Sequence, residues 1–504
     1  MQGVRNRLVK GAAMLGGARV IVNLTAFAST LVLARLLTPQ DFGLVALVIA
    51  VSAIVAAITD MSLNQALIQL ESPSESSYHT AFTLNLLRSI GLALLMLALG
   101  YPMALIYHDD RLVALMAVVA VITATAALDN PKLVVFQRNL QFKQAFAITV
   151  TERMVASLVA VGLAVLYRSY WALVLGTLAA AVIRVALSYA FIPYRPRLSL
   201  THWRQFLAFS IWLSLGKMVQ AANLRAIPLV VGAFLPAGAV GQYSVGERVA
   251  AMPIRESIGT LQSVLFPAYA RMRDDVERLQ RAYLRAQGSV SLFASPTGLG
   301  LAAIAAPLVP AVLGAKWIPA VPIVQAVAVA SAVMAIQNAL PLAMALGQQR
   351  ALFMRNVRVF AIQLPMLIAG LVLGRLSPLG GLGGLAVGLS TAAIVNTSIN
   401  LWLVRSISGI GIRAQIGAVV RPMLAAIAMA ASLMVAQEFL ISGQHPVTGL
   451  WLCVILVGAG AVIYAVLLGL LNLVWRNHDG AEAELFNIIR RVISSIRSKG
   501  PSAH

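Results

Sequence analysis

Acidic side chains are scarce in this sequence, and charged residues of both signs are few. Only 17 of the 504 residues are Asp or Glu, and all charged residues together make up 11%. A soluble protein carries about 25% charged and about 45–50% apolar residues, whereas 60% of this chain is hydrophobic. A soluble fold of this length cannot hide so much apolar surface, so the composition predicts a protein of the lipid bilayer.

Cysteine is almost absent as well. Cys453 is the single cysteine, which excludes a disulfide framework and a cysteine-based metal site. The six histidines are scattered, and no G-x-x-x-x-G-K-[ST] phosphate-binding loop occurs. We therefore expect no catalytic residues, metal, cofactor or enzymatic activity. A membrane-embedded glycan polymerase or ligase is the less favoured alternative, because such enzymes need acid/base or metal groups gathered at one membrane face.

What the sequence does contain is a series of apolar runs of about 20 residues, the length that spans about 30 Å of hydrocarbon as a helix. These runs predict an all-α integral membrane protein with about 14 transmembrane helices, arranged in two pseudo-symmetric lobes around a central cavity. The runs begin near Ala12, Phe42, Thr80, Leu112, Gln144, Tyr170, Gln205, Ala239, Gln287, Ala320, Arg355, Gly380, Ile416 and Gly449.

Basic residues alternate between the connections, which indicates the orientation. They gather near residues 5–10, 132–143, 195–204, 271–285, 350–358 and 405–421, while the intervening connections carry about one cation each. Because Lys and Arg near span ends favour the cytoplasmic side, both termini are predicted to be cytoplasmic in a multi-pass membrane protein. The segment from Glu71 to His79 is the exception. The net charge of +21 fits attraction to anionic membrane lipids, so no nucleic-acid partner is expected.

One apolar run, LVLARLLTPQDFGLVALVIA at residues 31–50, breaks in its middle and resumes at once. Pro39 cannot continue a helical hydrogen-bond ladder, so the break predicts a helix–helix turn, with Gly43 allowing close approach nearby. A similar seam follows in VVGAFLPAGAVGQYSVG at residues 230–246, where Leu235 precedes Gly241 by the same six residues that separate Leu37 from Gly43. This repeat predicts two lobes of about six spans each.

The repeat divides the chain into four parts. The N-terminal lobe is expected over residues 1–198 and the C-terminal lobe over residues 199–404, followed by two additional spans over 405–475. Residues 476–504 form a cytoplasmic tail. In this tail, apolar residues that share a helical face and a basic remainder make an amphipathic helix on the inner leaflet one interpretation. A partly disordered tail is the other.

Several cations interrupt the apolar runs, where ionisable residues are costly and usually functional. They predict a water-filled cavity whose substrate-binding cations are Arg19, Lys217, Arg248 and Arg255, with Asn23, Arg88 and Arg225 as further candidates. Arginine binds phosphate through its fixed donor fork, so the cavity would suit an amphiphile with an anionic head. In the alternative interpretation, Arg19 and Arg88 extend to the inner surface of the membrane.

Acidic residues near these cations have two interpretations. Glu247 and Glu256 are candidate coupling acids for ion-driven transport, or they neutralise arginines within a structural network. An ion-coupled small-molecule exporter, with Asp60 or Glu152 as other coupling groups, is therefore the main alternative function. The basic set argues against it, because such an exporter would favour an acidic cavity.

Four stretches resemble one known family: ARLLTPQDFG at 34–43, TDMSLNQALIQ at 59–69, FQRNLQFKQAFAI at 136–148 and VLFPAYARMRDD at 264–275. They are similar to the polysaccharide transporter branch of the multidrug/oligosaccharidyl-lipid/polysaccharide flippase superfamily. The resemblance implies a two-lobed helical bundle that moves undecaprenyl-diphosphate-linked oligosaccharides across the inner membrane by alternating access, for exopolysaccharide or lipopolysaccharide synthesis. Lipid-linked oligosaccharide is then the expected partner, and a polysaccharide polymerase and export machinery are candidate partners. The matching motifs are mostly turns and do not identify substrate-binding residues.

Overall fold

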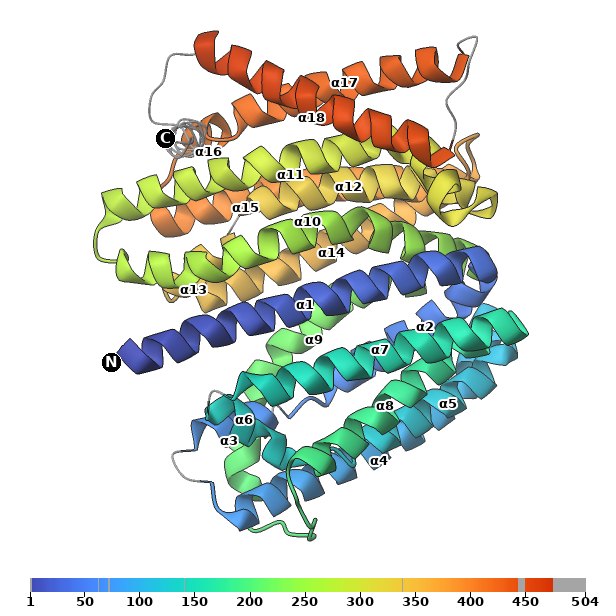
Figure 1. Ribbon diagram of the computed structural model, residues 1–504, viewed down its shortest axis with the longest axis vertical. Coiled ribbons are helices and arrows are strands. Elements are labelled where there is room, and N and C mark those ends of the chain that lie inside the picture. The colour runs from blue at the N-terminus through green and yellow to red at the C-terminus, as the bar shows by residue number, and fades with distance from the viewer. Residues whose placement is uncertain are drawn as a thin grey trace, which may run out of the picture. The chain divides into compact units, whose positions relative to one another are not determined.

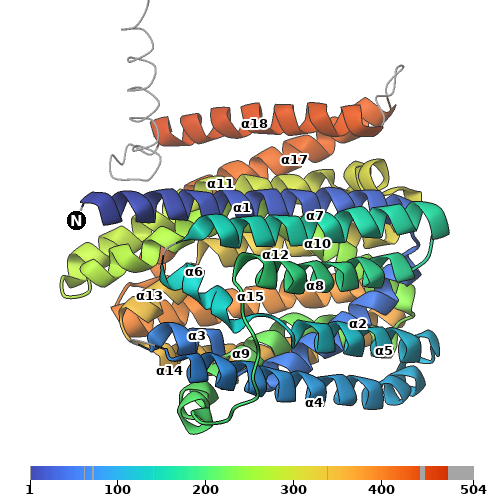
Figure 2. The same cartoon turned by 60° about the horizontal axis from the view of Figure 1, so that its bottom comes forward.

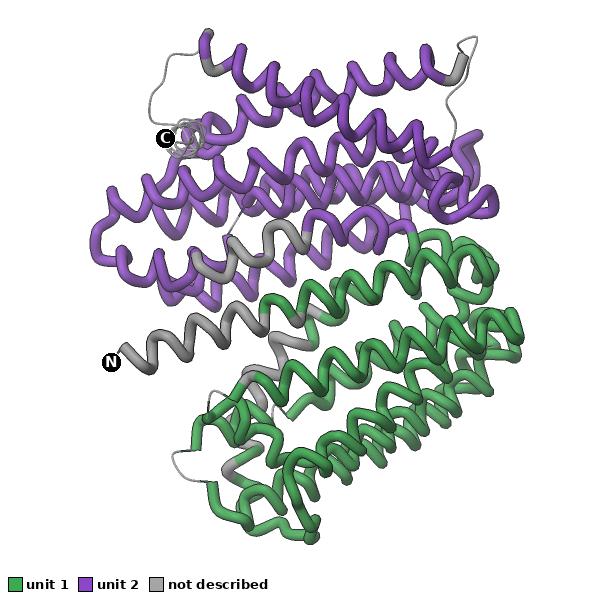
Figure 3. The backbone as a smooth tube through the Cα atoms, viewed as in Figure 1, with its two compact units in different colours: residues 1–245 green, residues 246–504 purple. Residues whose placement is uncertain are grey.

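The structure is a computed structural model that describes residues 2–61, 63–70, 73–139, 141–337, 339–442 and 449–474. The regular structure in these ranges is helical (Figure 1). The chain forms two compact units, residues 1–245 and 246–504 (Figure 3). The amphipathic helix predicted within residues 476–504 lies outside the described residues.

The first unit contains nine α-helices in full and the start of a tenth, among the described residues. They are α1 (Gln2–Leu36), α2 (Pro39–Ile58), α3 (Leu63–Gln69), α4 (Glu75–Tyr107), α5 (Arg111–Ala126), α6 (Val134–Arg138), α7 (Phe142–Tyr167), α8 (Trp171–Phe191) and α9 (Trp203–Phe234), with the short 3-10 helix η1 (Pro131–Leu133) before α6. Helix α10 (Ala237–Arg271) begins in this unit and continues into the second.

The second unit continues with eight α-helices in its described part. They are α11 (Val276–Leu313), α12 (Val321–Ile336), α13 (Ala339–Ala345), α14 (Gln349–Arg375), α15 (Gly380–Ser408), α16 (Ile412–Gly417), α17 (Val420–Ser442) and α18 (Gly449–Val474), with the 3-10 helix η2 (Ala315–Ala320) between α11 and α12. The last two long helices, α17 and α18, pack on α11 (Figures 1 and 2).

Many of these helices are suited to a bilayer. Within the described ranges, eleven helices are long and apolar enough to cross a membrane, or up to twelve if the bent pair formed by α5 and the η1–α6 segment counts as one span. Their outer faces carry large apolar side chains; Leu94 and Leu158, for example, are 62% and 68% exposed. The protein is therefore a multi-pass membrane protein with an all-helical fold.

The same packing order occurs inside each unit. In the first unit α7 packs on α8, α8 on α5, and α5 on α4. In the second, α14 packs on α15, α15 on α12, and α12 on α11. Each series also contains one interrupted helix, because α5 is followed by the short α6 and α12 by the short α13. The sequence of long and broken helices is thus repeated along the chain.

The predicted turn near Pro39 is present and has a well-formed cap. Thr38 is the N-cap of α2: the Asp41 N–H donates to Thr38 Oγ1 (3.3 Å), and the Thr38 N–H donates to Asp41 Oδ2 (2.8 Å). This reciprocal capping box satisfies two donors that the start of a helix leaves without partners. Pro39 occupies the first turn, where its missing N–H costs nothing.

The two similar seams lie against one another within the first unit. A Cβ atom built on Gly43 would stand 1.7 Å from the carbonyl oxygen of Ala237, and one built on Gly241 would stand 1.8 Å from the carbonyl oxygen of Pro39. The contact is reciprocal, because each glycine faces the first residue of the helix that carries the other. The prediction that Gly43 allows close helix approach is confirmed, and the partner is the second copy of the same motif.

The loop from α4 to α5 carries an ion pair at its tip. The Arg111 guanidinium donates from Nε to Asp109 Oδ1 (2.9 Å) and from Nη2 to Oδ2 (2.7 Å), and the Arg111 N–H donates to Oδ1 (3.1 Å). These hydrogen bonds hold the pKa of the Asp109 carboxyl below its usual value, although partial burial opposes the shift. The guanidinium also lies 5.8 Å from the ring centroid of Tyr170, before α8.

Candidate binding site

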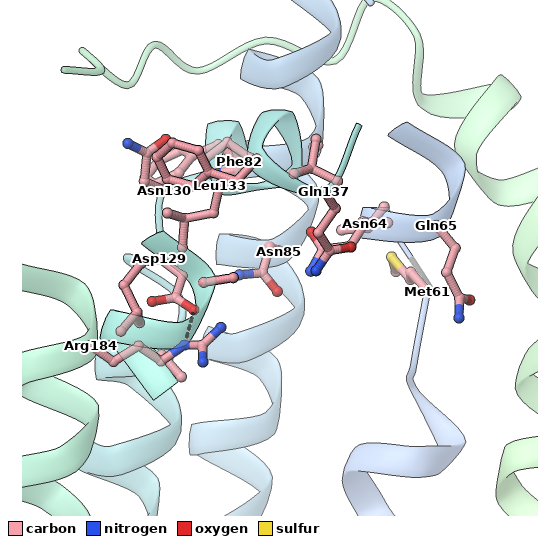
Figure 4. Close-up of a pocket in the computed structure, with 18 of the residues that line it drawn as sticks. Met61, Asn64, Gln65, Phe82, Asn85, Asp129, Asn130, Leu133, Gln137 and Arg184 are labelled. Atoms are coloured by element: carbon pink, nitrogen blue, oxygen red, sulfur yellow. Dashed lines mark hydrogen bonds and ion pairs between the residues drawn. The ribbon is translucent and has the colours of Figure 1, made fainter. Parts of the chain in front are cut away.

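A cavity of about 520 Å³ opens inside the first unit, where α5 gives way to α6 (Figure 4). Its walls come from α3, α4, the α5–α6 break, α7 and α8. The polar residues that line it are Asp60, Asn64, Gln65, Asn85, Arg88, Asp129, Asn130, Gln137, Thr149 and Arg184. A cavity this polar is unexpected between helices whose composition suits a bilayer.

The break that shapes the cavity is held in place by Asn130. Helix α5 and the η1–α6 segment meet at 63°, and proline follows Asn130 directly, which disfavours helical backbone before it. The Asn130 carboxamide is buried; it donates to the carbonyl oxygens of Ser188 (3.2 Å) and Ile192 (2.8 Å) and accepts from the Lys132 N–H (2.9 Å). These bonds attach the break to the end of α8 and cap η1.

Arg184 on α8 links two walls of the cavity, the α5–α6 break and α7. Arg184 Nε donates to Asp129 Oδ2 at 2.6 Å, and its Nη1 donates to Glu152 Oε2 on α7 at 3.2 Å. The side chain of Arg184 is 39% exposed, so the cluster faces the open space of the cavity. Two carboxylates thus share one guanidinium, and this guanidinium is already engaged by protein ligands.

The second arginine of the cavity is also engaged. Arg88 on α4 donates from Nη2 to the carbonyl oxygen of Ala56 (3.0 Å) and from Nε to Thr59 Oγ1 (3.3 Å), both near the end of α2. Asp60 lies close enough to act on Arg88 electrostatically. Through these two hydrogen bonds Arg88 attaches α4 to the end of α2.

Carboxamides provide the remaining polar surface. The side chains of Asn64 on α3, Asn85 on α4 and Gln137 on α6 extend toward the same space (Figure 4). Asn85 donates to the carbonyl oxygen of Ala127 at 3.4 Å. The exposed side chains of Asn64, Gln65 and Gln137 form no hydrogen bond with other residues that the structure describes. The cavity therefore presents both donors and acceptors that are not satisfied by the protein.

The corresponding helices of the second unit also enclose polar side chains, and there they are buried and partly bonded to one another; among the described residues, Gln337 Nε2, Asn400 Oδ1 and Arg355 Nε have no partner. Asn400 Nδ2 on α15 donates to Gln337 Oε1 at the end of α12, and the Tyr283 hydroxyl on α11 donates to the backbone carbonyl oxygen of Gln337. Arg355 on α14 donates to Asn396. The three carboxamides are each at most 6% exposed. This network is buried within the packing of the unit.

The structure brings one of the predicted site residues, Arg88, into this cavity. Arg19, Asn23 and Arg225 belong to the same unit but do not line the cavity; Arg19 and Arg225 are exposed, and Asn23 is half-buried. In the second unit, Arg248 is exposed and Glu247 is half-buried on α10. The side chains of Lys217, Arg255 and Glu256 lie outside the described residues.

The sequence interpretation did not include Asp129 and Arg184, nor the carboxamides of α3 and α6. Asp129 and Arg184 each interrupt an apolar run, so the rule that pointed to Arg88 also applied to them. Glu152, considered above as a coupling acid, is part of the Arg184 cluster. No local pattern pairs residues 55 positions apart, and the pairing depends on how α8 packs on α5.

Comparison with known proteins gives a family match over residues 32–322, to the family described as polysaccharide biosynthesis protein. Among curated proteins, the lipopolysaccharide biosynthesis protein WzxC of Escherichia coli (strain K12) is 24% identical over 409 residues, 79% of this chain and 81% of that protein. The succinoglycan biosynthesis transport protein ExoT of Rhizobium meliloti (strain 1021) is 24% identical over 330 residues, 65% of this chain and 67% of that protein.

Among solved structures, an inward closed conformation of the lipid II flippase MurJ is similar with a TM-score of 0.74. The match covers 91% of this chain and 99% of that one at 13% sequence identity. At this identity the likeness shows the fold alone: the chain shares the fold of that solved structure.

Proposed function

The chain belongs to the polysaccharide biosynthesis protein family, and from this premise we propose that it is a flippase for undecaprenyl-diphosphate-linked oligosaccharide repeat units. It moves them from the inner to the outer leaflet of the bacterial inner membrane by alternating access, for exopolysaccharide or lipopolysaccharide synthesis. The observation that carries the proposal is a hydrophilic cavity among helices apolar enough for a bilayer, because a polar headgroup crosses a bilayer only along such a path.

The proposed architecture has fourteen spans in two lobes. The bent α5–α6 pair, α9 and α10 would complete the fourteen alongside the eleven apolar helices. Residues 1–198 and 199–404 would form the two lobes, 405–475 two further spans and 476–504 a cytoplasmic tail, with both termini in the cytoplasm. The polymerase and the export machinery of the same polysaccharide would receive the product.

Within this proposal, cations bind the diphosphate. Arg19, Lys217, Arg248 and Arg255 would line the central cavity, and Glu247 and Glu256 would couple transport to an ion. Replacing Arg19 or Arg255 by alanine removes a charge-assisted contact of about 1.5–3 kcal/mol, which is about a tenfold to hundredfold loss of affinity. Lysine should restore only part of it, because it keeps the charge but loses the fork.

The test combines gene deletion with complementation. Deletion should stop the export of one polysaccharide and cause lipid-linked repeat units to accumulate, and the wild-type gene should restore export. Arg19→Ala and Arg255→Ala should lower export while the amount of protein in the membrane stays normal. Normal surface polymer in a deletion strain that has no second flippase would refute the function. Normal export by both alanine variants would refute the assignment of these cations.

A further inference from the structure

The cavity of the first unit differs in charge from the diphosphate site proposed above. Its lining holds two arginines and two aspartates, and Glu152 binds one of the arginines from outside the lining. Arg184 is shared by Asp129 and Glu152, while Arg88 is bound by Ala56 and Thr59. Cations are therefore neither in excess nor without partners, so this cavity does not suit a diphosphate.

A cationic or an apolar ligand fits no better. Asp129 Oδ2 and Glu152 Oε2 already accept from Arg184, and Asp60 is close enough to Arg88 to interact with it electrostatically. Asp129 Oδ1 has no partner among the described residues, but it is buried and so is not open to a cation. An apolar ligand would cover the carboxamides of Asn64, Gln65 and Gln137 and leave them without hydrogen bonds, which is unfavourable because a buried polar group then loses its water without gaining a partner. The cavity therefore suits a neutral, polar ligand with many groups that both donate and accept hydrogen bonds.

Sugar hydroxyls have this chemistry. A carboxamide has an acceptor oxygen and two donor hydrogens. A hydroxyl group can donate a hydrogen bond to the oxygen and accept one from the hydrogens. The carboxamides come from three different elements, α3, α4 and α6, and extend toward one space (Figure 4), so they could hold several hydroxyls of one ring. The volume of about 520 Å³ lies within the range of about 300–1,000 Å³ for small-molecule sites.

We infer that this cavity binds a sugar residue of the lipid-linked oligosaccharide, apart from the cations that bind its diphosphate. The inference rests on the proposed function and adds where the saccharide is recognised. The second unit differs: there Gln337, Asn396 and Asn400 are buried, and Asn400 donates to both other carboxamides. These buried carboxamides are at the end of α12 and on α15, which correspond to α5 and α8, whereas the exposed carboxamides of the first unit are on α3 and α6; saccharide recognition therefore belongs to the first unit.

The experiment compares two probes on the purified full-length protein in detergent. One is undecaprenyl diphosphate, which has no sugar; the other is the lipid-linked repeat unit extracted from cells that lack the gene. The test variant is Asn64→Ala combined with Gln137→Ala, because both side chains extend toward the same space (Figure 4). The matched control is Gln69→Ala, because Gln69 is an exposed carboxamide of the same helix α3 that does not line the cavity. Thermal unfolding verifies that each variant is folded.

Wild-type protein should bind the repeat unit more tightly than undecaprenyl diphosphate. The double variant should bind the repeat unit about two- to tenfold more weakly for each lost carboxamide, with unchanged affinity for undecaprenyl diphosphate, and Gln69→Ala should match the wild type. Unchanged affinity of the double variant for the repeat unit would overturn the inference, even if export fell. An equal loss for both probes would also overturn it. Failure of wild-type protein to bind either probe would refute the proposed function itself.

Discussion

Adding one methyl group at Gly43 should separate the two seams of the first unit. In Gly43→Ala the new Cβ would stand 1.7 Å from the Ala237 carbonyl oxygen and 2.6 Å from its carbon, whereas real Cβ atoms essentially never approach within 3.0 Å. Both obstructing atoms are backbone, so no side chain can rotate away, and α2 and α10 must move apart at their first turns. Overpacking lowers the free energy of unfolding by about 1–3 kcal/mol, and for Gly43→Ala we expect a loss of about 3 kcal/mol.

Gly241→Ala is the equivalent variant in the second copy of the motif, and Gly238→Ala is the control. Gly241→Ala should cost about as much, because its Cβ meets the Pro39 carbonyl oxygen at 1.8 Å. The double variant should cost less than the two single effects together, since both push the same turns apart. Gly238→Ala has no atom within 4 Å of the new Cβ. It should be neutral or stabilising by up to about 1 kcal/mol, because alanine favours helix.

The assay is the amount of each variant in the membrane, followed by denaturation of the purified protein. Gly43→Ala and Gly241→Ala should be depleted or should unfold earlier, and Gly238→Ala should behave as the wild type. If Gly43→Ala is as stable as Gly238→Ala, the two seams do not pack as described. Strict additivity in the double variant would show that the two glycines do not share one contact.

Three further predictions concern the cavity, a loop and the topology. Arg184→Ala should lower the free energy of unfolding by about 1–2 kcal/mol, because two partly exposed carboxylates lose their shared partner; adding Asp129→Asn should recover part of it, and no recovery would argue against the pairing. Asp109→Asn should be less stable than wild type at pH 7, because the pKa of Asp109 is lowered on folding. That difference should be complete above about pH 5 and shrink as the pH falls through the lowered pKa; a difference that persists in acid would contradict this. Cysteine at Gln40 should label from the periplasm and cysteine at Gln348 should not, and the opposite result would reverse the orientation.

The turn at Pro39 could be predicted because its causes are local. Proline, an N-cap threonine and an acidic N3 residue act within a few positions of one another, and they retain this effect in almost any fold. The matching spacing of Leu37 to Gly43 and Leu235 to Gly241 indicated a repeat. It did not indicate that the two copies touch, because that contact joins residues almost 200 positions apart.

The cavity could be predicted only in part. Arg88 was predictable because a charged side chain in an apolar run requires a polar environment. The carboxamides of Gln65 and Gln137 carry no such signal, since neutral amides near helix ends are common. Their role depends on the 63° bend after α5. Pro131 is a local signal for that break, but the hydrogen bonds of Asn130 to Ser188 and Ile192, which hold it in place, are long-range contacts. Sequence patterns indicate local periodicity and burial, but they do not indicate polar contacts between residues far apart in the chain.

The most direct test of the flippase function is the sidedness of the repeat unit itself. The lipid-linked repeat unit would be incorporated into vesicles with or without the purified protein, and externally added periodate would oxidise the saccharides of the outer leaflet. Without protein, about half of the repeat units should remain protected, because the headgroup is too polar to cross a bilayer unaided. With wild-type protein, the protected fraction should disappear over time. A protected fraction that stays the same in the presence of folded protein would contradict the proposal.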